Sequence, residues 1–217
     1  MKKEKLFTAG NVLLALVCTL FIISFAVVFT LNFRPLYYAD ITALDIPAIS
    51  GLAPGEIRAN YDALISYNSI FYTGPLQLPT LAMSVPGGIH FEEVKNIFLV
   101  VQTLLGVSFA VVCIGVFLKL RRKQVAFLKL TAIAAVAIPA VLGGLIALNW
   151  QMFFVGFHKL FFNNDYWIFD PRFDPVITIL PDTFFMHCAI LILVLVVAGS
   201  LLCYVVYRLL KRRWQQQ

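Results

Sequence analysis

Four long apolar runs constrain this chain more than any other feature. They cover residues 12–33, 97–118, 125–148 and 184–207, and their single charged residue is Lys129, near the start of the third run. A helix of about 20 apolar residues crosses the roughly 30 Å core of a bilayer. The composition agrees, because 61% of the residues are hydrophobic and 13% are charged, against about 45–50% and 25% in soluble domains. The sequence therefore predicts an all-α membrane protein with four transmembrane helices.

The distribution of charge predicts the orientation. With the N-terminus in the cytoplasm, twelve of the seventeen Lys and Arg residues fall on the cytoplasmic side, Lys2, Lys3 and Lys129 among them. Ten of the eleven acidic residues then lie outside, and only Glu4 lies within. This is the bias expected of a plasma-membrane protein with both termini in the cytoplasm. It explains the basic charge without nucleic acid, which we do not expect as a partner.

We expect residues 1–217 to form a single integral membrane domain. The first apolar run is longer than the roughly 7–15 residues of a signal-peptide core and lacks a small-residue cleavage site, so we expect it to be retained. Residues 34–96 and 149–183 would form an extracellular cap. In the cap the sequence predicts a helix at about 55–69, an irregular stretch at 72–80, and a turn at Gly87 and Gly88 before a helix that starts near Ile89.

Two of the three histidines fall where a span meets the cap. The second span begins just after His90 and the third ends just before His158, so both histidines should lie near the outer membrane plane. Ionisable side chains at this depth are candidates for a functional site. His187 lies one turn inside the fourth span, where we expect a hydrogen bond to a neighbouring helix.

Several carboxylates could orient these histidines and raise their basicity. Glu93 follows His90 by three residues and shares its helix face. Asp165 follows His158 by seven and would share its face if the helix continued that far. Asp170 and Asp174 compete for the same role, and the pattern does not choose among them.

The sequence contains only weak signals of other chemistries. His90, Glu93 and His158 could form a two-histidine, one-carboxylate zinc set, but His-x-x-Glu spacing is common and no His-Glu-x-x-His occurs, so we expect no metal and no cofactor. No Gly-x-Ser-x-Gly or Ser-x-x-Lys motif announces a nucleophile, which favours direct transfer or hydrolysis. Cap aromatic residues such as Tyr61, Tyr67 and Trp167 could form an interfacial belt or the walls of a lipid pocket.

Three blocks of the cap resemble a known family. The segments "NYDALISYN", "HFEEVKNIF" and "FHKLFFNNDYWIFDPRFDPVITILPDTFF" occur in this order, and the last is the most specific. With the four spans, they are similar to the lipoprotein intramolecular transacylase (Lit) family of low-GC Gram-positive bacteria. One departure is Glu93, where the family pattern leads us to expect an aspartate.

The resemblance implies an enzyme that acts on diacylglyceryl-modified lipoproteins in the membrane. It would move the sn-2 acyl chain to the α-amino group of the N-terminal cysteine and leave a lyso-form lipoprotein. His90 and His158 carry over as the catalytic pair, and no acyl-enzyme is needed because donor and acceptor belong to one substrate. The oxyanion could be stabilised by Tyr67, Asn68, Lys95 or a backbone amide.

Two alternatives stay open at this point. One is a membrane-embedded lipid or lipoprotein hydrolase, with or without a metal. The other is a non-enzymatic accessory protein whose aromatic cap binds membrane lipids.

Overall fold

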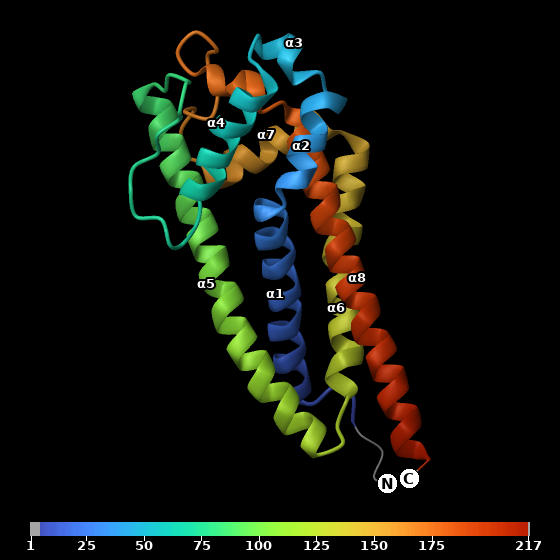
Figure 1. Cartoon of the computed structure of the whole chain (residues 1–217). Coiled ribbons are helices and arrows are strands. Elements are labelled where there is room, and N and C mark those ends of the chain that lie inside the picture. Colours follow the sequence, from blue (N-terminus) through green and yellow to red (C-terminus); the bar gives the residue numbers. More distant parts are fainter. Residues whose placement is uncertain (1–4, 217) are drawn as a thin grey trace. The chain divides into compact units, whose positions relative to one another are not determined.

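The computed structural model describes residues 5–216, so Lys2, Lys3 and Glu4, which contribute to the predicted orientation, lie outside the described residues. Within this range the chain is helical and contains no β-strand. Four of the described helices are long and apolar enough to cross a membrane: α1 (Ala9–Asn32), α5 (Val85–Arg121), α6 (Ala126–Leu148) and α8 (Asp182–Gln215) (Figure 1). The prediction of an all-α membrane protein with four spans is confirmed.

The described residues group into two compact units. The first contains the described chain through Val27, residues 102–145, and the chain from Leu191 onward. Small residues allow its helices to approach closely, as is usual for helices packed in a membrane. A Cβ atom on Gly115 would meet Leu14 Cδ1 at 2.5 Å, and one on Gly199 would meet Ile22 Cγ2 at 2.8 Å.

The second unit contains residues 28–101 and 146–190, and therefore both cap segments. Its shorter elements are α2 (Arg34–Ala43), α3 (Ile46–Ser50), α4 (Pro54–Tyr67), α7 (Trp150–Phe161) and the 3₁₀ helix η1 (Pro175–Ile179) (Figure 1). The predicted helix at 55–69 is confirmed by α4, and residues 72–80 are irregular as expected. Helices α2 and α3 were not predicted. The expectation that the whole chain acts as one membrane domain stays a prediction.

An aromatic core joins the two cap segments. Tyr37 of α2 stacks on Tyr61 of α4 with ring centroids 3.7 Å apart, and the edge of Phe184 faces both rings. The Tyr37 hydroxyl donates a 2.6 Å hydrogen bond to the carbonyl of Ile179. Segments more than a hundred residues apart therefore share one buried core.

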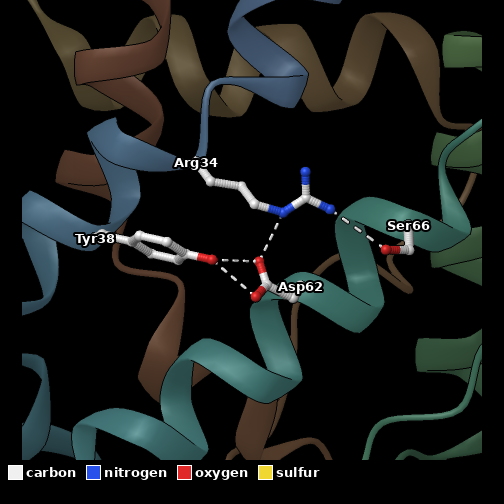
Figure 2. A network of polar contacts seen from close by, with 4 residues as sticks. All are labelled: Arg34, Tyr38, Asp62 and Ser66. Atoms are coloured by element: carbon white, nitrogen blue, oxygen red, sulfur yellow. Dashed lines mark hydrogen bonds and ion pairs between the residues drawn. The ribbon is translucent and has the colours of Figure 1, made fainter.

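A polar network also ties α2 to α4 (Figure 2). Arg34 donates to Asp62 Oδ1 at 2.8 Å, and the hydroxyl of Tyr38 donates to the same carboxylate at 2.8 Å. Ser66, one turn further along α4, accepts a weaker bond from Arg34 at 3.4 Å. About a third of the Arg34 and Asp62 side chains is exposed, so solvent screens this pair and it aligns the helices more than it stabilises them.

Helix α5 begins at Val85, four residues before the predicted start, and the expectation of a turn at Gly87 and Gly88 is wrong. The hydroxyl of Ser84 accepts a hydrogen bond from the amide of Gly87 at 3.1 Å, which caps the first turn of the helix. Asp174 accepts from the amide and the hydroxyl of Ser84 at 2.7 and 2.6 Å. A Cβ on Gly87 would collide with the Asp174 carboxylate, so only glycine allows the carboxylate to approach the helix this closely.

Candidate active site

His90 lies in the first turns of α5, in the interior of the second compact unit. Its side chain is buried, with 5% of the residue exposed. The helix start that Ser84 and Asp174 fix lies five residues earlier, at Val85, so the ring is held on a rigid element.

His158 comes from α7, the helix that follows the third span. The side chain of Asn149 accepts a hydrogen bond from the Met152 amide at 2.9 Å and caps α7. One turn before its end, His158 Nδ1 lies 2.8 Å from the carbonyl of Phe154. Because a carbonyl can only accept, Nδ1 carries the proton, and the lone pair of the neutral ring is on Nε2.

The two histidines, 68 positions apart in the sequence, lie side by side. Their ring centroids are 6.1 Å apart. Aromatic rings surround the pair: Trp167 stacks on His158 at 4.6 Å, and Phe162 and Phe169 present their edges to His90 at 4.7 and 5.5 Å. The sequence predicted this meeting from matching membrane depth.

Burial keeps both rings neutral. Burial, and to a smaller extent the neighbouring His158, lowers the pKa of His90 from 6.5 to about 4. Burial also lowers the pKa of His158, although its hydrogen bond to the Phe154 carbonyl acts in the opposite direction. Two neutral imidazoles can each accept a proton at neutral pH and pass it on.

The predicted pairing of these histidines with carboxylates is wrong. Helix α7 ends at Phe161, so Asp165 does not continue the face of His158 and lies exposed in the following loop. Asp170 instead pairs with Arg172 at 2.6 Å. Asp174 is buried and bonds to Ser84. In their place, the backbone carbonyl of residue 154 orients His158.

Glu93 shares the helix face of His90 but does not bond to it. Its Oε1 accepts a 2.8 Å hydrogen bond from the side-chain amide of Asn164. The carbonyl of Asn164 in turn accepts a 3.1 Å bond from the indole of Trp167, the ring that stacks on His158. Asn164 was not among the predicted site residues, although it lies in the most specific sequence block.

The remaining predicted residues are divided between two other places. Tyr61 belongs to the aromatic core, and Asn68 is buried and donates to the carbonyl of Leu64 at 2.8 Å. Tyr67 and Lys95 line a surface cavity of about 510 Å³ together with Glu92. The Lys95 ammonium lies 4.2 Å from the centre of the Tyr67 ring and donates to the Tyr72 carbonyl at 2.8 Å. Helical spacing puts this cavity on the face of α5 away from His90.

The third histidine does have a carboxylate partner. His187 Nδ1 lies 2.9 Å from an oxygen of Asp40, a buried residue of α2. The prediction that His187 hydrogen-bonds a neighbouring helix is confirmed. No sequence pattern indicated the partner, because 147 positions separate the two residues.

His90, Glu93 and His158 are the residues that the sequence offered as a zinc set. Among residues 5–216, no three His, Cys, Asp or Glu side chains come close enough together to hold a metal ion. Glu93 is engaged by Asn164, and His158 Nδ1 by a carbonyl.

The fold and this site define an integral membrane protein whose helices bring two histidines together among aromatic side chains. The model of the lipoprotein intramolecular transacylase Lit family matches residues 12–185. The chain belongs to this family and is an acyltransferase. No curated protein sequence matches it significantly.

Solved structures give the same assignment. The chain is 40% identical to the membrane-integral lipoprotein intramolecular transacylase Lit from Bacillus cereus, with a TM-score of 0.94 over 96% of this chain and 97% of that one. Variants of the same protein with one histidine replaced by arginine or by alanine match at 40% and 39% identity, with TM-scores of 0.87 and 0.88. The arginine variant is covered over 93% and the alanine variant over 94% of its length, each by 96% of this chain.

Proposed function

We propose that this enzyme transfers the sn-2 acyl chain of a diacylglyceryl-modified lipoprotein to the α-amino group of its N-terminal cysteine, with His90 and His158 as the proton-handling pair. The product is an N-acylated lyso-form lipoprotein. Family membership supports the class of substrate. The observation that carries the mechanism is the 6.1 Å separation of the buried His90 ring and the half-buried His158 ring, whose pKa values are both lowered by desolvation.

The chemistry needs proton transfers at two atoms, the amine nitrogen and the sn-2 oxygen. The amine must lose protons to attack the ester and become an amide, and the departing sn-2 oxygen must gain one. One neutral histidine acts as general base, and the other takes a proton from nitrogen and then, as an imidazolium, acts as general acid toward the departing oxygen. Attack of the amine on the ester carbonyl closes an eight-membered ring, so the aromatic surround would favour reaction by holding the two ends of one lipid together. No covalent acyl-enzyme forms.

The orientation of the chain belongs to the same proposal. Both termini would be cytoplasmic, and the cap, residues 34–96 and 149–183, would lie at the outer face of the cell membrane. A diacylglyceryl cysteine would sit at this depth, with its acyl chains in the bilayer and its ester groups at the head-group level. No cofactor and no nucleic acid enters the scheme.

Mass spectrometry of a diacylglyceryl lipopeptide incubated with the purified protein tests the proposal. Acyl transfer leaves the mass unchanged and moves one acyl chain to nitrogen, which fragmentation detects. We expect His90→Gln and His158→Gln each to slow the reaction by roughly a hundredfold or more, the range of general acid–base catalysis. His187→Gln is the matched control and should retain the reaction.

Other outcomes would contradict the proposal in distinct ways. Loss of one acyl chain from the mass would identify a hydrolase, and a loss abolished by a chelator would identify a metal-dependent one. Full activity in both His90→Gln and His158→Gln would refute the histidine mechanism.

A further inference from the structure

Two buried polar atoms on one face of α5 have no partner among the described residues. They are Nδ1 of His90 and Oε2 of Glu93. A buried polar group without a hydrogen bond is destabilising and therefore uncommon in folded proteins. One atom belongs to the histidine pair and the other lies one helical turn further along α5. A ligand bound at this site could therefore be the partner of both.

Glu93 is held with one oxygen engaged and the other available. Asn164 donates to Oε1 at 2.8 Å, and the Asn164 carbonyl receives the Trp167 indole. Since Trp167 stacks on His158, a continuous chain of contacts runs from the Glu93 carboxylate to the second histidine. The carboxylate is thus fixed in relation to both rings.

We expect the partner of Glu93 Oε2 to be a cation. Ion pairs within residues 5–216 join Arg34 to Asp62, Arg172 to Asp170 and His187 to Asp40, and none of them includes Glu93. Phosphate groups of membrane lipids are anionic and would be repelled by this carboxylate. The substrate of the proposed reaction carries one cation next to its reacting bonds: the α-ammonium group of the lipidated cysteine, with an ordinary pKa of about 8.

We propose that Oε2 of Glu93 binds the α-ammonium group of the substrate cysteine and places it beside His90. This inference rests on the proposed function and adds a positioning residue to it. His90 takes one proton from the ammonium, and the free amine attacks the sn-2 ester carbonyl. The tetrahedral intermediate loses its second nitrogen proton to His158, which delivers it to the departing sn-2 oxygen as the carbon–oxygen bond breaks. His90 then returns its proton to water, so atoms and charges balance.

Binding of unreactive analogues separates this role from a structural one. The probes are two dialkyl-ether lipopeptides, in which ethers replace the esters, one with the α-amine and one with hydrogen in its place. Their dissociation constants would be measured in detergent at about pH 6.5, where the amine is protonated. A charge-assisted hydrogen bond corresponds to roughly tenfold to a hundredfold in affinity, so wild-type protein should prefer the amine probe by that factor.

The variants give the decisive comparison. Glu93→Gln should reduce the preference for the amine to within about twofold, and Glu93→Asp should keep part of it. Glu92→Gln removes the neighbouring exposed carboxylate of the same helix and should keep all of it. If Glu93→Gln weakens both probes equally, Glu93 is structural and the inference is wrong.

An unchanged amine preference in Glu93→Gln would also overturn it and leave water as the partner of Oε2. The ether probes cannot react, so this result does not depend on acyl transfer. A wild-type protein that converts the ester lipopeptide but shows no amine preference would refute only this inference. One that leaves the ester lipopeptide unchanged would refute the proposed function itself.

Discussion

Acid should leave His90 uncharged well below the pH at which an ordinary histidine is protonated. Its pKa of about 4, against 6.5 for the free side chain, follows from burial and from His158. At pH 5.5 a ring with a pKa of 4 is about 97% neutral, whereas one with a pKa of 6.5 is about 9% neutral. The two descriptions therefore differ by roughly tenfold in the amount of available base.

The chain has only three histidines, which makes a direct titration practical. Ring carbons of ¹³C-labelled histidine would give three signals in detergent micelles, and a single His→Gln substitution would assign each one. We expect the midpoint of His90 near pH 4 and that of His158 below 6.5. Midpoints of both rings near 6.5 would refute the burial argument.

The same lowered pKa predicts how stability depends on pH. As the pH falls below 6.5, the unfolded chain takes up a proton at position 90 before the folded chain does, so stability is fully present above 6.5 and is lost toward pH 4. The gap between 6.5 and about 4 corresponds to about 3 kcal/mol. Chemical unfolding of His90→Gln should lack this part of the acid-dependent loss. An equal loss in both proteins would contradict it.

Three further substitutions test the support of the site. Trp167→Ala removes the indole that stacks on His158 at 4.6 Å; we expect a rate loss of about 10- to 100-fold in the lipopeptide assay, and a smaller one for Trp167→Phe. Gly87→Ala drives a methyl group into the Asp174 carboxylate at the start of α5, so it should lower both activity and melting temperature, while Gly55→Ala, in open space, serves as control. Tyr37→Phe leaves a buried carbonyl without its 2.6 Å donor and should cost about 1–3 kcal/mol in chemical unfolding; unchanged stability would contradict the core description.

Apolar length and proline positions made most of the fold predictable. The four spans follow from long apolar runs, and α4 follows from helical spacing with Pro54 at its start. Helices α2 and α3 were missed because each is short and its first turn contains a proline, which reads as a break when no tertiary contact is known. The start of α5 was misread for a related reason: two glycines suggest a turn unless the contact with Asp174 is known.

The sequence predicted the pair of histidines in the site but not the groups that orient them. Because His90 and His158 lie at matching depth at the ends of two spans, the sequence predicted that they meet. Their supports depend on details that spacing does not carry: α7 stops at Phe161, and the residue that holds Glu93 lies 71 positions away. Backbone carbonyls leave no trace in a sequence pattern, so the partner of His158 could not be foreseen.

The choice of partners explains why these rings can act as bases. A carboxylate beside an imidazole favours the charged ring. At the candidate active site the fold supplies instead a carbonyl, which fixes the tautomer of His158 without a full negative charge. The carboxylate of Glu93 accepts a hydrogen bond from Asn164 and, within the described part of the chain, has no hydrogen bond to either ring. In the proposed mechanism its negative charge would bind the substrate cation, and both imidazoles would stay neutral until the substrate delivers a proton.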